Sequence, residues 1–181
     1  MGVSKMKKTI CTAIALAVCA SSASAHVVFA DREAKPGSYY AGFLRVGHGC
    51  ENSPTVAIEV TIPEGVLSAR PQPLPGWSLR IEREARAKPI KGEDGTEIRD
   101  RVKTITWSGL LPPDQFQQFG LMMKLPEEPG ALYFPTVQRC KTGINSWTET
   151  PPAPAQWHDM HRPAPMLILT APDEPGSTHQ H

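Results

Sequence analysis

The sequence lacks any apolar run long enough to cross a membrane as a helix, which takes about 20 residues. Its longest run lies at 10–20, after three lysines and before an Ala-x-Ala site at 23–25. A basic segment, a short apolar core and a small-residue site in this order are typical of a secretion signal. We interpret residues 1–25 as a signal peptide, with a membrane anchor as the alternative. Cleavage after Ala25 would make His26 the first residue of the exported chain.

Positive charge is not in excess either. The 19 lysines and arginines include the three of the signal, whereas all 18 acidic residues follow it, so the exported chain is slightly acidic. Without a basic stripe, nucleic acid is not an expected partner. Residues 26–181 suffice for one domain with a sizeable core.

Cysteine is scarce, with four residues in the whole chain, and Cys11 and Cys19 leave with the signal. Cys50 and Cys140 remain, and two cysteines in an oxidising compartment predict a disulfide. Their separation excludes a CxxC redox pair, and closing so long a loop could contribute roughly 4 kcal/mol.

Cys19 also ends a segment, Leu16-Ala17-Val18-Cys19, that resembles the cleavage site of a lipoprotein. Val18 is branched where such sites normally carry a small residue. Cleavage there is an alternative interpretation, and it would leave His26 inside the chain.

A convincing amphipathic helix and an internal repeat are both absent, and the pattern is one of short strands. In Thr55–Ile62 the apolar residues from Val56 to Ile62 alternate with polar or small ones, and Phe116–Leu125 alternates in the same way. Further strands are expected at 27–29, 38–46, 77–84, 102–107, 132–137, 144–147 and 166–170, with a hairpin tip at 91–95. Such strands with proline-rich connections predict an all-β antiparallel sandwich over residues 26–172. Residues 151–165 are too rich in proline for regular structure, and 173–181 are expected to form a loose tail.

No Ser-His-Asp, paired-carboxylate or nucleotide-binding pattern stands out, so an enzyme is not the leading expectation. Two histidine clusters carry metal-binding side chains, His158-Asp159-Met160-His161 and His179-Gln180-His181. We interpret the first as polar residues of an exposed loop and the second as a flexible pair without a preorganised site.

His26 is the residue with the most distinctive chemistry. At a mature N-terminus, its α-amine and its imidazole Nδ1 could chelate one metal ion. Reference pKa values near 7.8 and 6.5 mean that few protons must leave at neutral pH. Nitrogen ligands in tetragonal geometry suit Cu(II). An N-terminal histidine by chance is the alternative explanation.

Seven short segments resemble the YcnI-like family of bacterial exported copper-binding proteins, in order along the chain. They are His26-Val27, Gly37-Ser38-Tyr39-Tyr40, Glu51-x-Ser53-Pro54-Thr55, Val60-x-Ile62-Pro63, Pro75-Gly76-Trp77, Ile105-Thr106-Trp107 and Trp147-Thr148. The resemblance runs from His26 to about residue 170. It implies an immunoglobulin- or cupredoxin-like β-sandwich.

The resemblance also implies a metal site. In the family, Cu(II) is held by the amine and imidazole of the N-terminal histidine, a monohistidine brace, and by one glutamate, with a tryptophan beside the metal. Those roles fall on His26, Glu51 and Trp147. The chain departs from the best-known members of the family in having Cys50 and Cys140, and in having His48, which could add a second imidazole.

The expected function is therefore copper storage, buffering or trafficking in the periplasm or at the cell surface, with one Cu(II) per chain. Other copper-trafficking proteins are the expected partners. Two alternatives stay open. A copper oxidase of the polysaccharide-monooxygenase type would need a second histidine, for which only His48 is available. A metal-free interaction module would make the position of His26 a coincidence.

Overall fold

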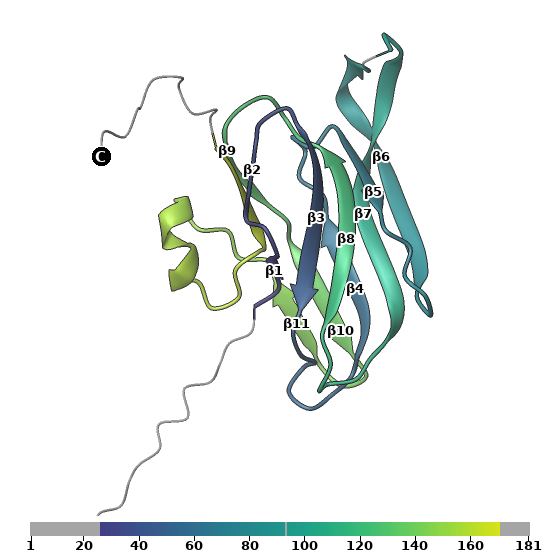
Figure 1. The fold of residues 1–181 in the computed structure, drawn as a ribbon, viewed down its shortest axis with the longest axis vertical. Helices are drawn as coiled ribbons and strands as arrows, with labels where there is room; N and C mark the ends of the chain where they lie inside the picture. Colours follow the sequence, from purple (N-terminus) through teal and green to yellow (C-terminus); the bar gives the residue numbers. More distant parts are fainter. Residues whose placement is uncertain (1–25, 93, 171–181) are drawn as a thin grey trace, which may run out of the picture.

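Two antiparallel sheets face one another across a layer of apolar side chains in the computed structural model, which describes residues 26–92 and 94–170 (Figure 1). The first sheet has the order β1 (Val28–Phe29), β3 (Tyr39–Val46), β8 (Gln117–Lys124), β5 (Ser68–Pro71). The second has the order β11 (Ile144–Trp147), β10 (Thr136–Cys140), β4 (Thr55–Thr61), β7 (Glu97–Leu111), β6 (Ser78–Lys91). The predicted all-β sandwich is confirmed.

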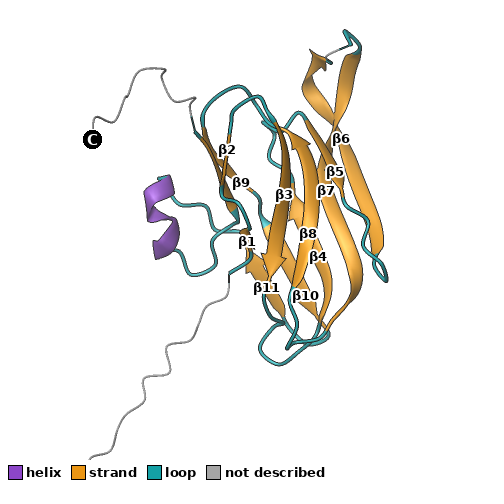
Figure 2. Cartoon of the chain, viewed as in Figure 1, coloured by secondary structure: helices purple, strands orange, loops and turns teal. Residues whose placement is uncertain are grey.

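A third, smaller sheet closes one side of the sandwich. Its order is β2 (Glu33–Ala34), β12 (Met166–Leu169), β9 (Gly130–Tyr133), and β2 pairs with β12 in parallel. The one helical element within the described ranges is the short 3-10 helix η1 (Pro154–Asp159), drawn in purple beside this sheet (Figure 2). No helix in those ranges is long and apolar enough to span a membrane.

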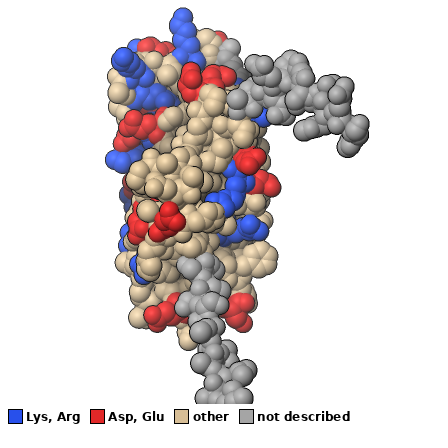
Figure 3. All heavy atoms as spheres, turned by 90° about the vertical axis from the view of Figure 1, so that its left-hand side faces the viewer, with Lys and Arg blue, Asp and Glu red and all other residues tan. Residues whose placement is uncertain are grey.

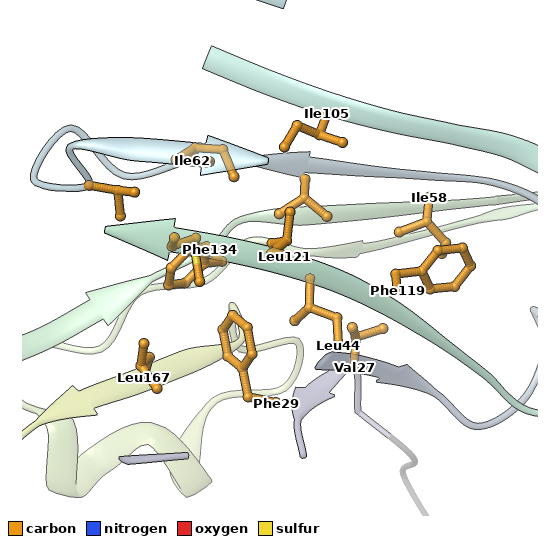
Figure 4. Packing of buried hydrophobic residues seen from close by; sticks show 14 of the residues in the cluster. Val27, Phe29, Leu44, Ile58, Ile62, Ile105, Phe119, Leu121, Phe134 and Leu167 are labelled. Carbon is orange, nitrogen blue, oxygen red and sulfur yellow. The ribbon is translucent and has the colours of Figure 1, made fainter. Parts of the chain in front are cut away.

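The core forms where alternate residues of both sheets point inward (Figure 4). Leu44 from β3 and Phe119 and Leu121 from β8 meet Ile58 from β4 and Ile105 from β7, and none is more than 2% exposed. The predicted alternation in β8 is confirmed, since Met123 is fully buried whereas its neighbour Met122 is 46% exposed.

Three sequence expectations need correction. The strand predicted at 132–137 is divided, because Phe134 and Pro135 separate β9, which pairs with β12, from β10, which pairs with β4 and β11. Pro135 has no N–H to donate to a neighbouring strand, so a break at this point is expected physically.

The second correction concerns β4, where the pairing shifts between Thr55 and Ala57. This shift buries Ala57 beside Ile58 and leaves Val56 only half-buried. Residues 151–165 hold η1, although no regular structure was predicted there.

Strands β6 and β7 are much longer than their predicted cores and form a ribbon that rises past the sheets (Figure 1). Its tip is the predicted hairpin turn, with Gly92 N–H donating to the Thr96 carbonyl and Gly95 at φ 79°. Both signs of charge crowd this upper end of the molecule, while the middle of the side seen in Figure 3 is mainly uncharged. Strands β2 and β5 were not predicted. The expected signal peptide and C-terminal tail lie outside the described residues.

Candidate metal centre

His26 is held at the start of the described chain by the short strand that follows it. Val27 and Phe29 are 1% and 0% exposed, and β1 pairs with β3 through Val28↔Arg45 and Phe29↔Leu44. This anchoring leaves the half-buried His26 at the edge of the sandwich. Its imidazole packs edge-on against Trp147, with ring centroids 5.4 Å apart. The structure therefore brings together two of the three residues that the resemblance assigns to the site.

Trp147 ends β11 and is only 5% exposed. Its indole Nε1–H donates to the side-chain oxygen Oε1 of Gln138, 3.3 Å away on the neighbouring strand β10. A buried indole N–H needs such an acceptor, because water cannot reach it. This hydrogen bond fixes the plane of the ring that touches His26.

Gln138 connects Trp147 to the loop at 47–54. Its Nε2 donates to the backbone carbonyl of His48 at 2.7 Å and to Thr55 Oγ1 at 2.8 Å. The side chain is 1% exposed, so these contacts compensate the loss of water. This role of Gln138 was not predicted, since an isolated glutamine in a strand has no recognisable pattern.

The loop at 47–54 carries Glu51 and is closed by the disulfide between Cys50 and Cys140, with Cα atoms 6.0 Å apart. The predicted disulfide is thus confirmed. Inside the loop, Ser53 N–H donates to the Cys50 carbonyl at 2.9 Å, so Glu51 occupies a tight turn. Glu51 is the one non-glycine with a positive φ in the described ranges, 56°, and its side chain is exposed. Such a backbone costs about 1–2 kcal/mol for an L-residue, so the disulfide and the turn hold Glu51 in a strained conformation.

His48 lies in the same loop and is half-buried. Its Nδ1 lies 2.5 Å from the Gly49 carbonyl oxygen. A nitrogen facing a carbonyl oxygen carries the proton and donates, which leaves Nε2 as the nitrogen with a lone pair. His48 therefore keeps one atom that could ligate a metal.

Trp157 is a second indole against His26, and sequence reasoning missed it. It lies on η1, is 3% exposed, and its ring centroid is 5.6 Å from that of His26. Its Nε1–H donates to the Ala164 carbonyl at 2.7 Å, and the Arg32 guanidinium stacks 4.5 Å above its ring. The only sequence signal was a tryptophan inside a proline-rich segment.

The sequence cluster at 158–161 begins beside this indole. The His158 ring lies 5.1 Å from that of Trp157, and the His161 backbone N–H donates to Glu149 Oε2. Nowhere in the described part of the chain do three His, Cys, Asp or Glu side chains converge to hold a metal ion. His179 and His181 lie outside that part.

Comparison with known proteins assigns the chain to a family. A family model described as "Domain of unknown function (DUF1775)", the domain of YcnI-like proteins, matches residues 26–169 and so begins at His26. The chain belongs to the DUF1775 family. No curated protein matches the chain.

Among solved structures, the DUF1775 chain is similar to an uncharacterized protein from Nocardia farcinica whose crystal structure reveals an immunoglobulin-like fold. The two share 28% identity with a TM-score of 0.60, over 80% of this chain and 97% of that one. A chain of a cohesin–dockerin complex from Clostridium thermocellum matches at 10% identity and a TM-score of 0.38, over 80% of this chain and 98% of that one. The immunoglobulin-like neighbour agrees with the sandwich described above.

The backbone nitrogen of His26 decides whether this residue can chelate a metal ion. In the 181-residue chain the His26 nitrogen is an amide, and it becomes a ligating amine only when the bond after Ala25 is cut. Among the described residues, the side chains of His26, His48 and Glu51 do not converge as a group of three donors. With the amine added, two nitrogens and one carboxylate would suit Cu(II).

Proposed function

We propose that the exported chain binds one Cu(II) ion through the amine and imidazole of His26 and the carboxylate of Glu51. The observation that carries the proposal is the contact between the His26 imidazole and the indole of Trp147. Two further hydrogen bonds lead from that indole through Gln138 to the loop that bears Glu51. Storage, buffering or trafficking of copper outside the cytoplasm is the function that such a site would serve.

The surroundings of His26 favour binding over redox catalysis. Two indoles cover the imidazole, so its orientation is restricted before a metal arrives, and preorganisation of this kind raises affinity. Carboxylate oxygen prefers harder ions, so a site that contains Glu51 favours Cu(II) over Cu(I) and opposes cycling between them. We therefore propose a binding protein rather than an oxidase, with Trp147 and Trp157 excluding water from the imidazole.

The mature N-terminus provides the sharpest test. Protein that begins at His26 should bind one Cu(II), whereas protein with one alanine before His26 should bind at least about a hundredfold more weakly, because the His26 nitrogen is then an amide and no longer pairs with the imidazole as an amine ligand. Copper titration followed by tryptophan fluorescence and electron paramagnetic resonance measures both, with intact mass confirming the N-terminus.

Glu51→Gln should weaken the site and change its Cu(II) spectrum, whereas Glu128→Gln, an exposed acid in another loop, should leave both as they are. Equal affinity in the two N-terminal forms would contradict the brace. An unchanged spectrum in Glu51→Gln would remove that ligand from the proposal, and His48→Gln would then test the remaining candidate.

A further inference from the structure

A second candidate site lies at the far end of β4 from the Glu51 loop. There, the residues after β4 and strands β6, β7 and β9 surround an open cleft of about 440 Å³. Its lining combines apolar side chains, among them Leu132 and Pro135, with the cations Arg101 and Lys103 and the acids Glu64 and Glu84. The seven residues of β4 separate this cleft from the loop by roughly 20 Å, so the two sites are distinct.

Arg101 is the unusual residue of this cleft, because its charged side chain is only 8% exposed. Its Nη2 donates to the backbone carbonyl of Ile62. Its Nε and Nη1 are buried without a hydrogen-bond partner among the described residues. A buried guanidinium with unused N–H groups carries a large free-energy cost, and an anion placed beside it would recover that cost.

Glu84 holds the nearest negative charge, but it pairs poorly with Arg101. Its Oε1 lies 3.7 Å from Nη1, too far for a hydrogen bond, whereas its Oε2 lies 3.0 Å from Lys103 Nζ. The Glu84 side chain is 35% exposed and can turn away while it keeps Lys103 as partner. It therefore covers the guanidinium without satisfying it.

Further positive charges lie near Arg101 and Glu84, in a second cleft that shares these two residues. A neighbouring cleft of about 610 Å³ is lined by Arg86, Lys88 and Arg101 with Glu64 and Glu84. Burial lowers the pKa of Arg86, and the positive charge of Arg101 lowers it further, because the two guanidinium groups repel one another. Four cations against two acids around the paired clefts leave a net attraction for an anion.

We propose that the cleft at Arg101 binds a small organic monocarboxylate with an apolar body. The ligand carboxylate takes the place of Glu84 beside Nη1, and its apolar part lies on Leu132 and Pro135. A doubly charged phosphate fits less well, because Glu64 and Glu84 line the same cleft and Nη2 is already engaged. This inference does not depend on the proposed copper site.

Benzoate is the probe that combines one carboxylate with an apolar body, and its binding to the mature, copper-free protein can be followed by amide chemical shifts. Benzoate should bind at least about tenfold more tightly than its uncharged analogue benzamide, since it alone offers a charge-assisted hydrogen bond. It should also bind more tightly than acetate, which lacks the apolar body, and more tightly than inorganic phosphate.

Two variants shift the affinity in opposite directions. Arg101→Gln should abolish benzoate binding, whereas Glu84→Gln should strengthen it several-fold by removing the competing carboxylate. Arg99→Gln, an exposed arginine of the same ribbon paired with Glu97, is the matched control and should change nothing. The gain in Glu84→Gln keeps the test valid even where Arg101→Gln fails to fold.

Three results would overturn the proposal. Equal affinity for benzoate and benzamide would remove the carboxylate from recognition. Tighter binding of phosphate would show that the ligand class is wrong. No shift at residues of the cleft with any probe, in the native protein and in Glu84→Gln, would mean that the guanidinium is satisfied by water alone.

Discussion

Gln138 shows how one polar side chain can organise a site from inside the core. It occupies an inward position of β10, between the buried residues Thr136 and Cys140, where an apolar residue would ordinarily pack. Its amide donates to the loop at 47–54 and accepts from Trp147. Because both ends of the amide are engaged, its orientation is fixed, and so is that of the indole.

We expect Gln138→Leu to lower the free energy of unfolding by about 2–4 kcal/mol. The substitution keeps the volume but leaves the Trp147 N–H and the His48 carbonyl without partners, and each such group costs about 1–3 kcal/mol. Chemical denaturation measures the loss, and Gln115→Leu, on an exposed loop, is the control. Copper affinity should fall as well; a variant as stable as the native protein would show that Gln138 does not organise the site.

At the scale of elements, the disulfide holds the loop at 47–54 against the end of β10. It joins the residue before Glu51 to the end of β10, and the Cys50 N–H also lies 3.0 Å from Cys140 Sγ. Ser53 Oγ accepts from the Thr142 N–H on the next turn, so the loop also contacts the chain beyond the disulfide. Two adjacent turns are thereby held together at one end of the sandwich.

Replacing both cysteines by serine should lower the free energy of unfolding by about 2–5 kcal/mol, because the unfolded chain gains the entropy of an open loop. The freed loop should also relax the positive φ of Glu51 and weaken copper binding by roughly tenfold, an effect comparable to loss of an outer-shell contact. Denaturation and copper titration on the same preparation separate the two effects. Reduced stability with unchanged copper affinity would mean that the turn alone positions Glu51.

The elements that depend on local pattern were predicted well. Strand β8, expected from its alternation, and the hairpin tip at 91–95 were both predicted correctly. The break after β9 was missed: residues 132–137 were predicted as one strand, although Pro135 has no N–H for a ladder. Strand β2 has two residues and exists only because β12 lies beside it, which no local pattern reveals.

The candidate site likewise has residues that were predicted and one that was not. His26, Trp147 and the disulfide were predicted from residue chemistry and from the family resemblance, and the structure brings His26 to Trp147. Trp157 could not be predicted, since its contact with His26 joins the two ends of the domain and depends on the docking of η1. The copper ligands themselves stay a prediction.

At the scale of the whole molecule, the first sheet and the segment after β1 are joined through Tyr40. Its ring meets Phe29 at 6.2 Å, and its hydroxyl donates to the backbone carbonyl of Asp31. Burial, and next the negative charge of Asp31, raise the pKa of Tyr40 to about 12. The folded protein therefore holds this proton more tightly than the unfolded chain, in which tyrosine has a pKa near 10.

This difference makes global stability depend on pH in the alkaline range. The contribution of Tyr40 is fully present below pH 10, and it is lost as the pH rises from about 10 to about 12, because only the unfolded chain ionises there. The free energy of unfolding, measured by denaturation at fixed pH values, should fall across this window. Tyr40→Phe should be less stable at neutral pH, by about 1 kcal/mol for the lost hydrogen bond, and should show a shallower fall. Tyr39→Phe, whose exposed ring lies under Lys124, should keep the native slope, and an equal slope in Tyr40→Phe would place the alkaline sensitivity elsewhere in the fold.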